Sequence, residues 1–247
     1  MKDLTEADYK EFDVNRLKEI WEPRKEYIEK DLWVIRNFLS EKEILWLSEL
    51  ANDPEGWYIT MRSPYGGNTR NKFIGYVPEH DENGKVLLPS PNSKHKSTQW
   101  NRFSINARVE SVVIAETDGV GTLQSFFEVP DEQIMAELGH DVDYAMDFHY
   151  ERDDDEEHFG KPSDSNAEGK ITAAYSIYIN DNYDGGLLEF KNKNYSIEPE
   201  PGMLINIPLY KEFEHRISKV TNGNRHTLYG RSWDSAENKH LSTSEDC

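Results

Sequence analysis

The residues of this chain best suited to chemistry are histidines and carboxylates within short, β-like runs of sequence. His149 and Glu151 are separated by one residue in the run DFHYER. On a β-strand, positions i and i+2 point to the same face, so this imidazole and this carboxylate can converge on one ion. His215 lies in a later run, EFEHRISKV. Two histidines and one carboxylate form the facial triad that holds a non-haem Fe(II) ion and leaves coordination positions open.

Each of these signals also has an ordinary structural interpretation. A His-x-Glu pair on a strand is common, and an exposed pair is simply part of a solvated face. Arg225 opens the last predicted strand, and its planar fork of donors is suited to holding a carboxylate. Taken alone, Arg225 is better explained as a partner in a surface ion pair.

Composition narrows the function classes. The chain has 247 residues, with 47 acidic and 28 basic side chains, giving a formal net charge of −19. This balance argues against binding nucleic acid or anionic membranes. Because apolar runs are short and the N-terminal segment is charged, we predict neither a membrane span nor a signal peptide, and a cytoplasmic location. Cys247 is the single cysteine, so any metal must be held by histidine and carboxylate.

The N-terminal half predicts a helical layer. Residues up to 30 read as charged helical material broken at Pro23, and residues 32–35 (LWVI) as a strand. Ser40 and Glu43 form a capping box that starts the next helix. Residues 52–102 predict long loops around short strands, whereas residues 103–128 fit either a helix or a strand.

The C-terminal half predicts a β-sandwich or barrel. From about residue 133, short β-like runs alternate with turns rich in Gly, Asn, Asp and Pro. We therefore expect a mainly β fold with flanking helices in a single domain. It comprises an N-terminal helical support over about 1–130, a β core over about 131–235 and a polar tail over 236–247.

The order and spacing of several motifs resemble one family. These are His149-Tyr150-Glu151, YIND (178–181), GGLLEF (185–190), PGMLINIP (201–208), His215 and GNR (223–225). They are similar to the double-stranded β-helix (jelly-roll) core of the Fe(II)/2-oxoglutarate-dependent dioxygenases, in the prolyl 4-hydroxylase-like branch. The similarity covers about 100 residues well and residues 34–44 loosely, while residues 52–130 match no family we can name.

The resemblance implies a role for each motif residue. His149, Glu151 and His215 would be the catalytic residues that ligate Fe(II), and Arg225 would bind the C5 carboxylate of 2-oxoglutarate. Tyr178 would place its hydroxyl on the same carboxylate, or serve only as a core aromatic. Gly185 and Gly186 are better explained as turn residues than as ligand contacts.

This sequence departs from the family pattern in two places. The first motif is H-x-E rather than the more common H-x-D, and Asp153 is a less favoured alternative to Glu151 as the carboxylate ligand. Arg231 shares a strand face with Arg225 by parity, so it faces either an acidic substrate or an ion-pair partner. The acidic run 153–157 lacks the spacing of a calcium loop and predicts a solvated loop.

The implied reaction is hydroxylation of an unactivated C–H bond, coupled to oxidative decarboxylation of 2-oxoglutarate to succinate and CO2. Its partners would be 2-oxoglutarate, O2, accessory ascorbate, and a peptide, protein or amino-acid substrate, with a prolyl residue as the leading candidate. Two alternatives stay open: a jelly-roll binding protein that has lost catalysis, and a cupin-like metalloenzyme that uses no 2-oxoglutarate.

Overall fold

Helices, two main β-sheets and two short pairs of strands make up the part of the chain that can be described. The computed structural model describes residues 14–52, 58–60, 69–73, 79–80, 86–87, 102–117, 120–130, 133, 144–149, 171–208 and 211–233. Its helices are α2 (Val14–Trp21), α3 (Glu41–Asn52) and α4 (Arg102–Thr117), with 3-10 turns at Glu22–Arg24 and Lys211–Phe213. Among these, no helix has both the length and the apolar character needed to cross a membrane.

The larger sheet is antiparallel, and its strands come from both halves of the chain. Its order is β1-β2-β13-β9-β16-β7-β4-β3. The bounds are β1 (Glu26–Glu29), β2 (Leu32–Ile35), β3 (Tyr58–Thr60), β4 (Thr69–Phe73), β7 (Val120–Val129), β9 (Ile171–Tyr178), β13 (Leu204–Pro208) and β16 (Arg225–Trp233). The segment before residue 131 therefore supplies strands of this sheet as well as the helical layer.

The smaller sheet faces the larger one and completes a sandwich. Its order is β12-β11-β14-β8. The bounds are β8 (Tyr144–His149), β11 (Leu188–Phe190), β12 (Ser196–Ile197) and β14 (His215–Ser218), while β10 (Asp184–Gly185) pairs with β15 (Val220–Asn222), and β5 (Glu79–His80) with β6 (Val86–Leu87). Buried Ile205 and Ile207 of β13 pack with Leu188 and Phe190 of β11 in one apolar cluster between the sheets. The predicted mainly β, jelly-roll architecture is confirmed.

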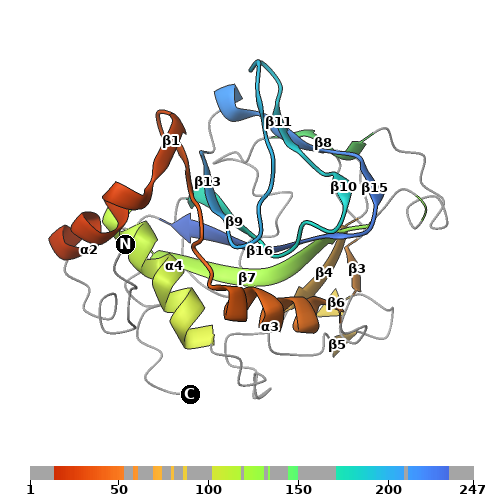
Figure 1. Cartoon of the computed structure of the whole chain (residues 1–247), viewed down its shortest axis with the longest axis horizontal. Coiled ribbons are helices and arrows are strands. Elements are labelled where there is room, and N and C mark those ends of the chain that lie inside the picture. Colours follow the sequence, from red (N-terminus) through yellow and green to blue (C-terminus); the bar gives the residue numbers. More distant parts are fainter. Residues whose placement is uncertain are drawn as a thin grey trace.

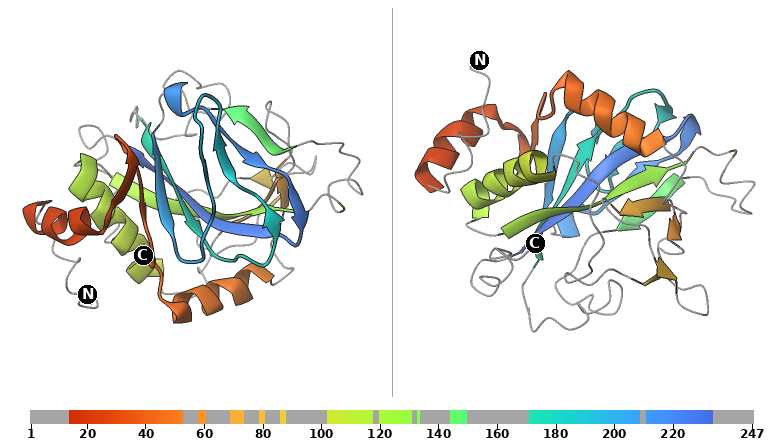
Figure 2. Two further views of the ribbon diagram at one scale, coloured as in Figure 1. Left: turned by 45° about the horizontal axis from the view of Figure 1, so that its top comes forward. Right: turned by 90° about the horizontal axis from the view of Figure 1, so that it is seen from below.

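Helices cover the other face of the larger sheet. In Figure 1, α3 and α4 lie on the side of β7 and β16 away from β8 and β11, and the turned views in Figure 2 show α2 beside α4. Trp21, Leu47 and Val109 from these helices share a buried cluster with Tyr175 of β9 and Leu228 of β16. The larger sheet thus lies between an outer helical layer and the smaller sheet.

Two N-terminal segments show how pairing decides local structure. We predicted helical material up to residue 30, but the structure is helical only to Arg24, and β1 then pairs antiparallel with β2. A tight turn at Asp31 (φ 67°) joins the two strands, so the hairpin bonds replace helical ones. The ambiguous residues 103–128 contain nearly all of helix α4 and most of strand β7.

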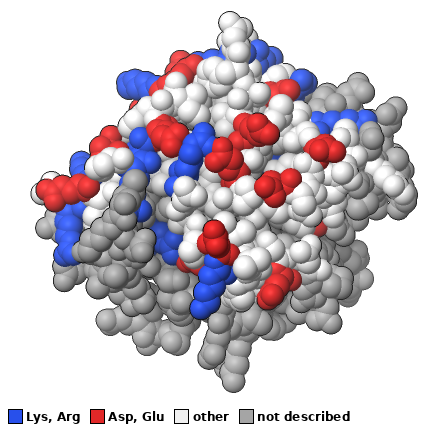
Figure 3. Space-filling view, viewed as in Figure 1, with Lys and Arg blue, Asp and Glu red and all other residues white. Residues whose placement is uncertain are grey.

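Charged side chains of both signs are interspersed over the face drawn in Figure 3. Among the ion pairs, Arg36 lies 3.0 Å from Glu26, and Lys193 lies 2.6 Å from Glu29. Exposed pairs of this kind contribute little to stability. Folding therefore depends mainly on the two apolar clusters and on a few partly buried polar contacts.

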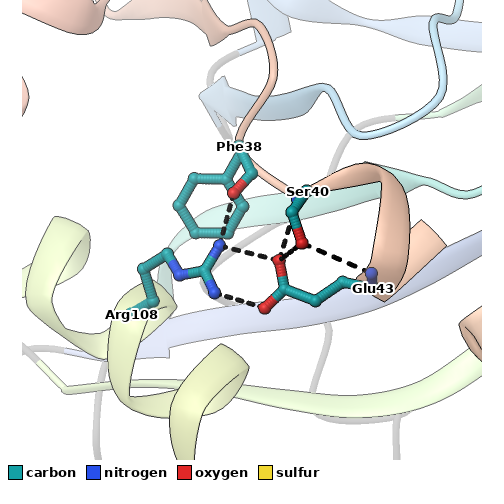
Figure 4. Close-up of polar contacts among 4 residues, drawn as sticks. All are labelled: Phe38, Ser40, Glu43 and Arg108. Atoms are coloured by element: carbon teal, nitrogen blue, oxygen red, sulfur yellow. Dashed lines mark hydrogen bonds and ion pairs between the residues drawn. The ribbon is translucent and has the colours of Figure 1, made fainter. Parts of the chain in front are cut away.

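The predicted capping box is confirmed and extended by a third residue (Figure 4). The Ser40 backbone N–H donates to Glu43 Oε2 at 2.8 Å, and the Glu43 N–H donates to Ser40 Oγ at 3.3 Å. Arg108 of α4 donates to both Glu43 carboxylate oxygens and, at 2.5 Å, to the Phe38 carbonyl oxygen. The N-terminus of α3 is thereby fastened to α4.

Glu43 should make stability depend on pH. Burial raises the pKa of its carboxyl, but bonds from Arg108 and Ser40 outweigh burial and hold the pKa below 4.5. The carboxylate therefore stabilises the fold above its unfolded-state pKa, and this contribution disappears as pH falls through the lower folded-state pKa. We expect Glu43→Gln to lower the free energy of unfolding by about 2 kcal/mol at pH 7. In urea titrations the gap to wild type should narrow below pH 4.5.

Glu41→Gln is the matched control, because Glu41 is an exposed glutamate in the same first turn of α3. It should change the free energy of unfolding by less than about 0.5 kcal/mol. Equal effects of the two substitutions would show that the contact between α3 and α4 is not what Glu43 contributes.

Candidate metal and carboxylate site

Two of the three predicted metal ligands lie side by side on neighbouring strands. His149 ends β8 and His215 begins β14, and the antiparallel register makes them direct partners. Their ring centroids are 4.5 Å apart, with an interplanar angle of 55°. Because directly paired residues share a sheet face, the two imidazoles can contact one ion.

The environment of His215 prepares it to be a ligand. The residue is only 7% exposed, and its Nδ1 lies 2.9 Å from the Phe213 carbonyl oxygen. A carbonyl only accepts, so Nδ1 carries the proton and Nε2 keeps its lone pair for a metal. Burial, together with His149, lowers the pKa of His215 to about 3. The ring is therefore neutral at physiological pH, as metal binding requires.

Glu151, the predicted third ligand, lies outside the described residues, as do its alternative Asp153 and the acidic run 153–157. Arg231 is described only through its backbone, in β16 opposite Ala174 of β9. The assignment of Glu151 and the role of Arg231 stay predictions.

Arg225 is buried on the opposite wall of the sandwich. It opens β16 and is 3% exposed, and its Nε has no hydrogen-bond partner. No carboxylate among the described residues forms an ion pair with it, so the predicted alternative of a surface ion pair does not describe this side chain. A buried cation without an anionic partner is costly, because desolvation of the charge is not compensated. This position fits the carboxylate of a ligand.

The ring of Tyr178 lies next to this guanidinium. The Arg225 Cζ atom lies 4.9 Å from the centroid of the Tyr178 ring, and Tyr178 is 1% exposed. Tyr178 pairs directly with Thr227 of β16, which shares a strand face with Arg225. Burial raises the pKa of the Tyr178 phenol, and Arg225 partly opposes this rise. The phenol stays neutral and can hydrogen-bond beside the guanidinium.

The sequence analysis did not identify a second phenol near Arg225, that of Tyr183. Burial raises the pKa of Tyr183 to about 12, and the Arg225 guanidinium acts against that rise by charge and by a hydrogen bond. The sequence signal was an aromatic residue between YIND and the Gly-Gly turn. It was overlooked because a lone aromatic in a turn carries no chemistry of its own.

The imidazole pair and the guanidinium face the same interior. Phe190 lies 6.1 Å from the His215 ring, and it belongs to the buried cluster that contains Tyr178. Facing sheets in a sandwich are separated by about 10 Å. The arrangement can therefore hold a small molecule that chelates a metal at the imidazoles and presents a carboxylate to Arg225.

Comparison with known proteins supports the fold. No protein-family model matches the chain, and no curated protein does. Among solved structures, an oxidoreductase of the 2OG-Fe(II) oxygenase family from Burkholderia pseudomallei aligns with 13% identity over 96% of each chain, at a TM-score of 0.51. A Pseudomonas putida prolyl-4-hydroxylase aligns with 13% identity over 90% of this chain and 98% of its own, at a TM-score of 0.50. The resemblance predicted from the motifs is confirmed at the level of the fold.

The buried guanidinium predicts an unusual mutational response. Replacing Arg225 by Met removes an uncompensated charge and keeps most of the side-chain volume. We expect the free energy of unfolding to rise, or to fall by no more than about 1 kcal/mol. Arg108→Met is the matched control, because it breaks the bonds to Glu43 and Phe38 and should lower stability by about 2 kcal/mol. Equal losses in urea titrations would indicate that Arg225 is a structural ion-pair residue.

Proposed function

We propose that this protein is an Fe(II)/2-oxoglutarate-dependent oxygenase that hydroxylates an unactivated C–H bond. One observation carries the proposal: an adjacent pair of imidazoles and a buried guanidinium, which has no carboxylate partner among the described residues, face one interior. The first fits a metal ion, and the second fits the distal carboxylate of a dicarboxylic acid. The shared fold with a member of the 2OG-Fe(II) oxygenase family supports the same reading.

His149 and His215 would hold the metal, with Glu151 as the carboxylate ligand. The Phe213 carbonyl fixes the His215 tautomer and ring orientation, which raises the ligand strength of Nε2. When bound, Fe(II) with 2-oxoglutarate supplies the oxidising chemistry that converts O2 and a C–H bond to a hydroxyl group, with succinate and CO2 as co-products. Ascorbate would be an accessory reductant.

Arg225 and Tyr178 would orient the co-substrate. A guanidinium offers two parallel donors to a carboxylate, and removal of solvent strengthens this charge-assisted bond. The Tyr178 hydroxyl adds a neutral donor on the same wall. These groups therefore favour a dicarboxylate over a monocarboxylate of similar size, because the latter would leave Arg225 unpaired.

A prolyl residue in a peptide is the proposed substrate, with other amino-acid side chains and free amino acids as alternatives. The support is the fold shared with the protein named a prolyl-4-hydroxylase from Pseudomonas putida. If the Arg231 side chain faces the cavity, it would favour an acidic residue near the target.

Ligand substitutions should separate metal binding from folding. We expect His149→Ala, His215→Ala and Glu151→Gln to lower succinate formation from 2-oxoglutarate at least a hundredfold. Asp153→Asn should keep wild-type turnover, and it is the matched control for Glu151→Gln. The readout is succinate by mass spectrometry under aerobic conditions with Fe(II) and ascorbate. If Asp153→Asn abolished succinate formation and Glu151→Gln did not, Asp153 rather than Glu151 would be the carboxylate ligand.

The same assay distinguishes the alternatives. A jelly-roll binding protein without catalysis would form no succinate at any concentration of Fe(II). A cupin-like metalloenzyme would keep its activity in Arg225→Ala, whereas we expect this variant to raise the KM for 2-oxoglutarate by at least tenfold.

The substrate is tested with paired peptides. We expect proline-containing peptides to stimulate succinate formation and to gain the mass of one oxygen atom, while matched peptides with alanine in place of proline do neither. Stimulation by both peptides of a pair would contradict hydroxylation at proline.

A further inference from the structure

A tyrosine and a glycine converge on the stem of Arg225. Tyr183 lies just before β10, and Gly186 directly follows it. A Cβ atom placed on Gly186 would lie 2.9 Å from Arg225 Cδ, 2.9 Å from Tyr183 Cε2 and 3.3 Å from Val220 Cγ2. Since real Cβ contacts are longer, this position must be glycine for the arginine stem and the tyrosine ring to occupy their places.

The backbone at Gly186 is held firmly. Its φ is +66°, a conformation that glycine adopts without strain. Its N–H donates to the Lys219 carbonyl oxygen at 3.0 Å, just before β15. The glycine that we interpreted only as a turn residue therefore also forms a fixed surface against the Arg225 stem.

Tyr183 forms the neighbouring surface. Its partly buried ring packs against a small cluster of Val129, Ile217 and Val220, which come from β7, β14 and β15. Val129 is the direct strand partner of Arg225. The ring is therefore held by the same elements that position the arginine. The Tyr183 hydroxyl also forms a hydrogen bond with the Arg225 guanidinium.

We propose that Tyr183 and Gly186 are positioning residues that fix the stem of Arg225, and so set how far its guanidinium reaches toward the co-substrate. A free arginine side chain loses rotamer entropy when it binds a ligand. A stem fixed beforehand avoids much of that loss and presents the fork in one place. This inference rests on the proposed function and deepens it, because it assigns residues that determine affinity for the distal carboxylate.

The test compares Tyr183→Phe with a matched control, Tyr195→Phe. Tyr195 is also partly buried, but its hydroxyl bonds Glu29 at 2.9 Å on another part of the surface. Calorimetry would measure 2-oxoglutarate binding to the Mn(II)-loaded full chain. We expect a tenfold weaker Kd for Tyr183→Phe, because one bond to a charged group is lost, and a change below twofold for Tyr195→Phe.

Kinetics and a truncated ligand separate positioning from general damage. Tyr183→Phe should raise the KM for 2-oxoglutarate about tenfold and leave kcat within twofold. It should not alter the Kd of 2-oxobutanoate, which lacks the distal carboxylate. Gly186→Ala should weaken 2-oxoglutarate binding further, and if that variant does not fold, Tyr183→Phe decides alone.

The outcomes distinguish the two proposals. If wild type binds 2-oxoglutarate and Tyr183→Phe binds it within twofold of wild type, the positioning role is wrong and the proposed function stands. The positioning role would also be wrong if Tyr183→Phe weakened the binding of 2-oxoglutarate and of 2-oxobutanoate equally. If wild type does not bind 2-oxoglutarate at all, the proposed function itself is contradicted.

Discussion

A guanidinium buried inside a β-sandwich, with no carboxylate partner among the described residues, is the constraint that organises the site. Arg225 opens β16, where neighbouring strands remove it from solvent. Such a charge destabilises a fold unless an anion meets it. Of the residues that the structure describes around it, phenols, a glycine and apolar side chains lie close to the arginine, and none of them is an acidic partner. This is the arrangement expected of a carboxylate-binding pocket, in which the ligand completes the electrostatics.

The imidazole pair of the candidate site follows from strand register. His149 and His215 would be unrelated residues if β8 and β14 were paired one position differently, because one step in register moves a side chain to the other face. The pairing instead makes them direct partners, with the remaining nitrogen of His215 oriented by Phe213. The two imidazoles and the Arg225 guanidinium thus lie on opposite walls of one β-sandwich.

The helical layer stabilises the sheet that carries Arg225 by packing on its outer face. Trp21, Leu47 and Val109 bury the outer face of the larger sheet, so its inner face is free to carry polar groups. The contact of Arg108 with Glu43 and Phe38 fixes α3 against α4 behind that sheet. Stability is supplied on one face while the other holds the buried charge, which is how a protein can tolerate a locally unfavourable site.

The sequence by itself determined the period of the strands, the capping box and the order of the motifs. Residues 32–35 and 225–233 form strands over the predicted lengths, because β-forming residues and flanking turn residues act locally. His149, His215, Arg225 and Tyr178 could be nominated because their types and spacing limit what chemistry is possible.

Only the tertiary structure decided what depends on contacts between distant segments. It turned residues 26–29 from an expected helix into a strand, because hairpin pairing with β2 outweighs local helical preference. It also showed that Arg225 is buried rather than paired at the surface, and that Tyr183 and Gly186 meet its stem. Burial and close packing are properties of the assembled sandwich, so no pattern within a single segment could reveal them.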